Sequence, residues 1–119
     1  MAKHLDLGNQ GENLAIDYLI NRGFTILERN YRFQKAEVDI IVQKESLLIA
    51  VEVKTRATKA FGNPQDFLKP NQIQRIVKAM DHYITSQHLD VELRFDIIAV
   101  VKEGSKTEIE HLENAFYHF

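Results

Sequence analysis

Three charged residues in two predicted β-strands have the types and spacing for metal-dependent hydrolysis. Asp39 lies in EVDIIVQ, and Glu52 and Lys54 follow the apolar run LLIAV at residues 47–51. Carboxylate oxygens are hard ligands that suit Mg²⁺ or Mn²⁺. A lysine beside the metal can orient water and offset the charge of a phosphate. Asp39, Glu52 and Lys54 are therefore candidate catalytic residues, and the two acids are candidate metal ligands.

A tight turn between the two strands would bring these residues together. Only residues 43–46 separate the apolar segments, and a turn centred on the last two of them pairs residues whose numbers sum to 91. Asp39 then faces Glu52, and Glu37 faces Lys54, with opposed Cβ atoms about 5 Å apart. Since side chains alternate along a strand, all four are expected on one face of the sheet.

Two carboxylates that face each other in a half-buried sheet need a positive partner. Burying one unpaired charge costs roughly several kcal/mol even after the surroundings relax. The partner is a metal ion, Lys54 or a proton, and a metal bridged by Asp39 and Glu52 explains the paired acids. The alternative is an edge hairpin in which Glu37 pairs with Lys54 and both acids face water. The apolar flanks DIIV and LLIAV favour the buried arrangement.

The predicted order of elements is α-β-β-β-α-β, which indicates one mixed sheet with helices packed on it. The third strand is the most continuously apolar and is expected to be central and covered on both faces. In chain order the elements are a helix in LGNQGENLAIDYLINRGF, strands in FTILERNYRF, EVDIIVQ and LLIAVEVKTR, a helix in NQIQRIVKAMDHYITSQH, a strand in LRFDIIAVVK and a weak last element in residues 109–116.

Local signals predict where the helices begin and end. Gly8 or Asn9 is the expected cap of the first helix and Gly23 its end, and Asn71 is the expected cap of the second. The first strand is expected to kink or bulge near residues 28–30.

Composition indicates a cytoplasmic protein with a single domain over residues 1–119. The chain has no cysteine, which excludes a disulfide framework and a thiolate zinc site. Its N-terminus lacks the apolar core of a signal peptide, and the longest apolar runs, about five residues, are far short of the ~20 that span a membrane.

Charge is unevenly distributed along the chain. The net charge is −2, yet residues 54–80 hold six Lys or Arg and one Asp, a net charge of +5. This basic segment is suited to phosphates, and the alternative is an ordinary solvated helix face. Tyr31, Phe33 and Phe61 could stack on bases or serve as core anchors. The five histidines have no metal-binding spacing and are expected to be surface or structural residues.

The arrangement of Asp39, Glu52 and Lys54 resembles the PD-(D/E)xK nuclease superfamily. The chain is closer to one branch, the YraN-like family of small bacterial proteins, which look like Holliday-junction resolvases. The segments that carry the resemblance cover nearly the whole chain in order: GNQGENLAIDYLINRGFTILERNYR, EVDIIV, VEVKTR, FGNPQDF, RFDIIAV and ENAF.

The resemblance implies a restriction-endonuclease-like core, with a mixed central sheet flanked by helices, and Mg²⁺- or Mn²⁺-dependent cleavage of phosphodiester bonds. Asp39 and Glu52 would bind the metal together with the main-chain carbonyl of Val53, and Lys54 would orient the attacking water. Glu12, in the first helix, would match an additional acidic residue of resolvase-like members.

The chain departs from the family pattern at three positions. Val38 stands in place of the proline in the superfamily's name, Ala36 where the family tends to have glycine, and Asn71 where relatives often have a basic residue. The expected phosphate contacts are therefore Arg56, Lys59, Lys69, Gln72, Arg75 and Lys78.

The residue pattern and the resemblance together predict an endonuclease that hydrolyses DNA, and the resemblance implies branched or structured DNA as the substrate. A homodimer follows by analogy with resolvases, which cut symmetric junctions as dimers. The alternatives are a non-catalytic nucleic-acid-binding or scaffold module that keeps the nuclease fold, and a protein–protein adaptor.

Overall fold

Two helices and five strands make up the fold. The computed structural model describes residues 3–57 and 68–116, with side chains from residue 10 onwards. The predicted order of elements is confirmed, and the weak last element is a strand. The elements are α1 (Lys3–Asn21), β1 (Thr25–Phe33), β2 (Ala36–Lys44), β3 (Leu47–Arg56), α2 (Pro70–Ser86), β4 (Glu92–Glu103) and β5 (Lys106–Leu112).

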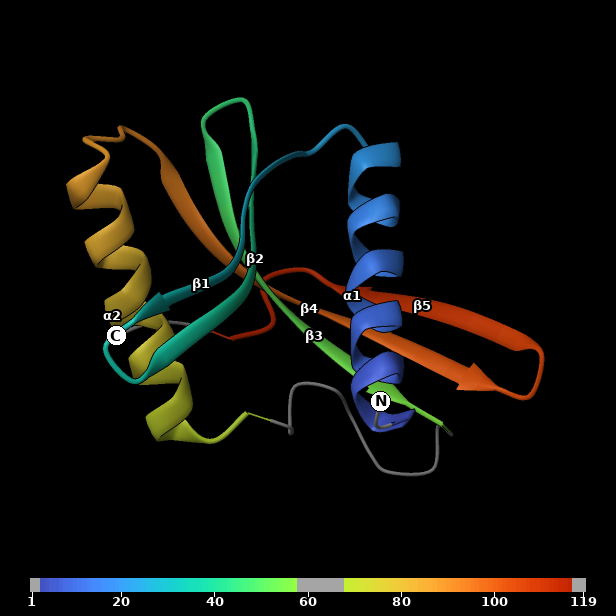
Figure 1. The fold of residues 1–119 in the computed structure, drawn as a ribbon. Helices are drawn as coiled ribbons and strands as arrows, with labels where there is room; N and C mark the ends of the chain where they lie inside the picture. Colours follow the sequence, from blue (N-terminus) through green and yellow to red (C-terminus); the bar gives the residue numbers. More distant parts are fainter. Residues whose placement is uncertain (1–2, 58–67, 117–119) are drawn as a thin grey trace.

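The strands form one mixed sheet in the order β1-β2-β3-β4-β5 (Figure 1). Neighbouring strands are antiparallel except β3 and β4, which run parallel because α2 lies in the connection between them. The predicted central position of β3 is confirmed.

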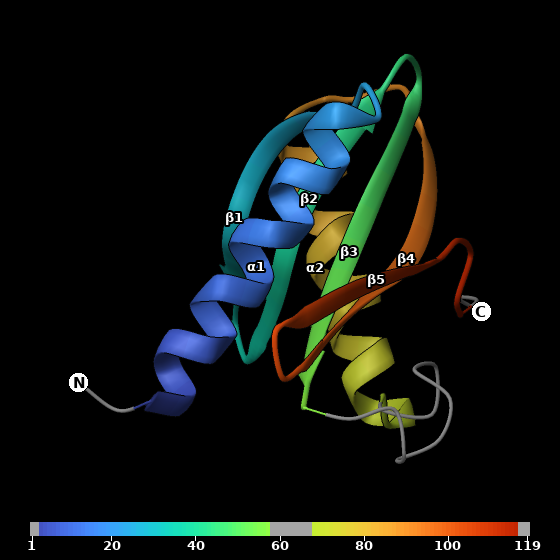
Figure 2. The same cartoon turned by 90° about the vertical axis from the view of Figure 1, so that its right-hand side faces the viewer.

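The two helices cover opposite faces of the sheet (Figure 2). On one face, Ala15 and Leu19 of α1 pack with buried residues of the central strands, namely Ile40, Val42, Ile49, Val51, Ile98 and Val100. On the other face, the buried stripe of α2 packs with Ile41, Leu48, Ala50, Phe95 and Ile97; this stripe is Ile76, Ala79, Met80 and Tyr83. β3 is therefore covered on both faces, as its continuous apolar run predicted.

Both helices begin earlier than the cap signals predicted. α1 begins at Lys3, since one glycine inside a helix costs only about 1 kcal/mol and Gly8 does not stop it. α2 begins at Pro70 with Lys69 at the cap position and no side-chain cap, because proline is favoured in the first helical turn. Asn71 therefore lies inside α2.

The predicted end of α1 at Gly23 is confirmed. The Phe24 N–H donates to the Leu19 carbonyl (3.0 Å) and the Gly23 N–H to the Ile20 carbonyl (3.0 Å), which is the Schellman pattern. Gly23 has a φ of +90°, a conformation that favours glycine.

The predicted irregularity of β1 is also confirmed. Its pairing with β2 shifts between Ile26 and Glu28, and Asn30 has a φ of +52°. No helix among the described residues is both long and apolar enough to cross a membrane.

Candidate active site

The predicted register of the β2–β3 hairpin is confirmed. The partners run from Lys44↔Leu47 to Ile40↔Val51, and each pair of numbers sums to 91. Glu45, in the turn, has a φ of +56°. The regular pairing ends at Ile40↔Val51, immediately before Asp39 and Glu52.

Beyond that point the two carboxylates replace the ladder of backbone hydrogen bonds. The Asp39 N–H donates to Glu52 Oε2 (3.2 Å), and the Val53 N–H donates to Asp39 Oδ2 (2.8 Å). Each acid is therefore held by the opposite strand, while β2 diverges from β3 toward β1 (Figure 1). We call this divergence, with Asp39, Glu52 and Val53, the strand fork.

The expected pairing of Glu37 with Lys54 is wrong. Ile40 and Val38 are two residues apart but pack on opposite faces of the sheet, so the alternation of β2 breaks at the strand fork. β2 then follows β1, where Glu37 lies opposite Arg32 and forms an ion pair with it (3.2 Å). The prediction assumed that the hairpin stays regular past the fork.

The surroundings of Asp39 and Glu52 raise the pKa of both carboxyl groups. Glu52 is 3% exposed, and burial raises its pKa from 4.5 to about 8, with a further contribution from the Asp39 carboxylate. Burial also raises the pKa of Asp39 from 3.8 to about 6. The charge of Lys54 opposes both shifts but does not cancel them. Glu52 therefore retains its proton near neutral pH, and the pair is suited to bind a cation in its place.

Lys54 and Glu12 lie close enough to change the charge balance of the pair. Lys54 is half-buried, and among the described residues its ammonium has no hydrogen bond or ion pair. Glu12 is 20% exposed, and its charge contributes to the raised pKa of Asp39 after the larger effect of burial. All four candidate catalytic residues are thus brought to the strand fork.

The fork presents oxygen donors that fit Mg²⁺ or Mn²⁺. The carboxylates of Asp39 and Glu52 are hard ligands. The N–H and C=O of one residue point to the same side of a strand, so the Val53 carbonyl faces β2 as its N–H does. The three residues predicted as metal ligands therefore lie together at the strand fork. One carboxylate oxygen of Asp39 and one of Glu52 already accept a hydrogen bond from a backbone N–H.

Two residues that position Glu12 were missed by the sequence analysis. Arg29 Nη2 lies 3.7 Å from Glu12 Oε1 and donates to Asn13 Oδ1 (3.1 Å). A Cβ atom on Gly11 would lie 1.8 Å from Thr55 Oγ1, so only glycine allows α1 to approach β3 this closely. An isolated glycine in a helical pattern was the available signal for this contact.

We expect Gly11→Ala to destabilise the protein and lower its midpoint temperature by several degrees. Alanine would favour an isolated helix by about 1 kcal/mol, but its Cβ overlaps Thr55 and displaces α1. Thermal unfolding measures the change, and Asp17→Ala, at an exposed position of α1, is the control. A stabilised Gly11→Ala protein would contradict the close contact.

The raised pKa values predict that stability falls as pH rises from 5 to 8. In this range the folded protein holds protons on Asp39 and Glu52 that the unfolded chain has released, so the free energy of unfolding decreases with pH. The slope is at most about 1.4 kcal/mol per pH unit for each proton. We expect Glu52→Gln to flatten this slope in urea unfolding measured without metal, and an unchanged slope would contradict the raised pKa.

A second buried carboxylate, Asp96 on β4, shows the opposite balance. It is fully buried, and Arg94 donates two hydrogen bonds to it (2.9 Å each). His111 Nε2 lies 2.7 Å away and the Asn114 N–H donates at 2.9 Å. Burial alone would raise the pKa of Asp96, but these partners hold it below its usual value. Asp96 is therefore a satisfied structural anchor, and His111 is structural as predicted.

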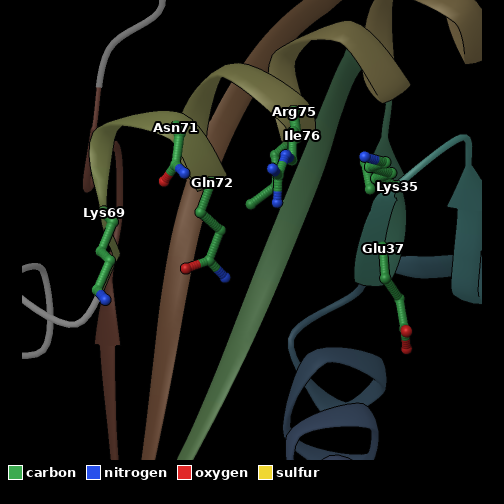
Figure 3. A pocket seen from close by; sticks show the side chains of 8 residues that line it. Lys35, Glu37, Lys69, Asn71, Gln72, Arg75 and Ile76 are labelled. Carbon is green, nitrogen blue, oxygen red and sulfur yellow. The ribbon is translucent and has the colours of Figure 1, made fainter.

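Most of the predicted phosphate contacts gather along α2. Lys69, Gln72 and Arg75 line a hollow of about 370 Å³ and extend from α2 in a similar direction (Figure 3). Lys78 lines the adjoining hollow. Lys35, in the β1–β2 turn, lines both hollows and was missed, because nothing local in the sequence relates it to α2.

Arg56, another predicted contact, does not line these hollows. Arg56 ends β3, and its guanidinium donates to the Thr55 carbonyl (3.0 Å). Lys59 and Phe61 lie outside the described residues.

Fold and site together define an α/β protein with an acidic pair at the divergence of two central strands. The chain belongs to UPF0102, described as an uncharacterised protein family, whose pattern matches residues 11–100. UPF0102 is the YraN-like family, so the predicted resemblance to that family is confirmed.

Several relatives match over nearly their whole length. UPF0102 proteins of Christiangramia forsetii and Flavobacterium psychrophilum are each 58% identical over 100% of both chains. A UPF0102 protein of Bacteroides thetaiotaomicron is 43% identical over 98% of this chain and 97% of its own. The matched region contains all four candidate catalytic residues.

Proposed function

We propose that this protein is a metal-dependent endonuclease of the PD-(D/E)xK superfamily that hydrolyses DNA phosphodiester bonds, with branched or structured DNA as its substrate. The observation that carries the proposal is the strand fork, where the buried Glu52 and the half-buried Asp39 lie together and the charge of Lys54 only partly compensates them. Ionisable residues with strongly shifted pKa values cluster at functional sites.

The strand fork can supply the parts that phosphodiester hydrolysis needs. Asp39, Glu52 and the Val53 carbonyl would hold Mg²⁺ or Mn²⁺, which when bound offsets charge on the phosphate and lowers the pKa of water. The Lys54 ammonium can orient the attacking water and stabilise negative charge on the transferring phosphate. Glu12 can accept a hydrogen bond from a water at the same site.

The fold is consistent with the proposed restriction-endonuclease-like core. α1 precedes the antiparallel strands β1, β2 and β3, and α2 leads to β4, which is parallel to β3. This is the order that the resemblance implies. A single cytoplasmic domain that acts as a homodimer on symmetric junctions belongs to the same proposal.

Mn²⁺ or Mg²⁺ is expected to stabilise the protein more at pH 8 than at pH 5.5. The metal must displace protons from Asp39 and Glu52, and fewer remain at the higher pH. Thermal unfolding with and without metal measures the effect, and Asp39→Asn and Glu52→Gln should remove it. Glu45→Gln, in the exposed turn of the same hairpin, is the matched control. An equal metal shift in Glu52→Gln would place the metal elsewhere.

The wild-type protein is expected to cleave a four-way junction in Mg²⁺ or Mn²⁺. Glu52→Gln and Lys54→Ala should each lower the rate by about 10²-fold or more, because each removes a group that offsets charge in the transition state. Single-turnover cleavage of labelled junctions and linear duplexes measures the rates. If the folded wild-type protein cuts neither substrate with either metal, the enzyme proposal fails.

A non-catalytic nucleic-acid-binding or scaffold module remains the second candidate. The net charge of −2 favours it, since a dedicated polyanion-binding enzyme is more often basic. Tight binding of junctions without turnover would select this candidate, and salt-insensitive absence of any nucleic-acid binding would select a protein–protein adaptor.

A further inference from the structure

A continuous groove runs between the β1–β2 turn and α2. Three hollows of about 370, 250 and 350 Å³ adjoin along it. The first two share Lys35 and Arg75 as lining residues, and the second and third share Phe33 and Lys78. We call these three hollows together the α2 groove; Figure 3 shows the first of them.

The α2 groove is basic although the chain is acidic. Four cations line it, against the carboxylates of Glu37 and Asp81, for a net charge of +2; the cations are Lys35, Lys69, Arg75 and Lys78. All four cations are exposed, and within residues 3–57 and 68–116 none has an ion pair or a side-chain hydrogen bond. Glu37 is neutralised by Arg32 (3.2 Å). The groove therefore has charges available for phosphates.

A flat aromatic surface lies in the third hollow. The rings of Phe33 and His82 stack with centroids 4.1 Å apart and planes 18° from parallel. Phe33 is half-buried against the α2 core, whereas His82 is exposed, so the stack is supported on one side and open on the other. Bases in a duplex already stack on each other, so a protein ring of this kind takes an unpaired base.

The groove begins close to the strand fork and leads away from it. Glu37 lines its first hollow and is two residues from Asp39 on β2. From Lys69 to Thr85 the lining follows the whole of α2, about 24 Å at 1.5 Å per residue. This length is comparable with single-strand sites of about four nucleotides.

We propose that the α2 groove binds a single DNA strand, with its phosphates on Lys35, Arg75 and Lys78 and an unpaired base stacked on His82. This inference rests on the proposed function, because it names the substrate class: DNA with an unpaired arm that lies along α2 while the phosphodiester to be cut reaches the strand fork.

The test measures binding of a fluorescein-labelled oligothymidine of about 12 nucleotides by anisotropy, in EDTA and at several salt concentrations. Arg75→Ala and Lys78→Ala should each weaken binding and reduce the slope of log affinity against log salt by about 0.7. Lys106→Ala removes an exposed lysine in the β4–β5 hairpin and should bind as the wild type does.

His82→Ala tests the stacking separately from the charge. We expect binding to weaken at least about fivefold with no change in the salt slope, because a stacked base is lost and no phosphate contact is. His88→Asn removes an exposed imidazole just beyond α2 and is the matched control. Unchanged binding by His82→Ala would overturn the inference, as would equal affinity for a duplex of the same length or tighter binding of the corresponding uridine strand.

Failure of this inference is distinguishable from failure of the proposed function. EDTA prevents cleavage, so binding is measured without the metal. If the groove variants bind single strands as the wild type does, the groove assignment is wrong, and metal-dependent junction cleavage by the wild type then leaves the endonuclease proposal standing. If single strands bind with the expected losses and no metal supports cleavage, the groove stands and the endonuclease proposal fails.

Discussion

The site depends on two adjacent carboxylates, the buried Glu52 and the half-buried Asp39, that lie together without enough positive charge. Asp96 shows that the same sheet can satisfy a buried acid completely, with an arginine, a histidine and a backbone N–H around it. Asp39 and Glu52 receive one backbone N–H each, and Lys54 only partly offsets their charge. The first arrangement stabilises the fold, whereas the second reduces stability and leaves a place for a cation.

The strand fork is what allows the carboxylates to lie there. In a regular hairpin of this register the backbone of Val53 would pair with β2, but β2 leaves β3 on the N-terminal side of Ile40 and stays paired with β1. The side chains then take over the free N–H groups. Because β3 remains paired with β4 over its full length and helices cover both faces, the acids are held on rigid elements rather than on a loop.

The acidic strand fork and the basic α2 groove lie next to each other. The acidic pair would repel a bare phosphate, while the basic α2 groove beside it attracts the rest of a polyanion. Glu37 lies between the two regions, and its ion pair with Arg32 limits its repulsion of a strand in the groove. A metal at the strand fork would reverse the local sign and make the two regions act together.

The sequence by itself determined the order of the elements, the central position of β3 and the register that brings Asp39 opposite Glu52. These features follow from local periodicity and from the short turn, so they can be predicted without the tertiary structure. The types and spacing of the residues also indicated Lys54, and the resemblance to the family added Glu12.

Only the tertiary structure decided how the site is completed. The partner of Glu37, the contact of Gly11 with Thr55 and the placement of Lys35 beside α2 all join residues that are not related by any local pattern. The pairing of Asp96 with His111 is of the same kind, across 15 residues. Such contacts depend on where the strands diverge and how closely the helices approach the sheet, and those distances are set by packing of the whole core rather than by the residues on either side.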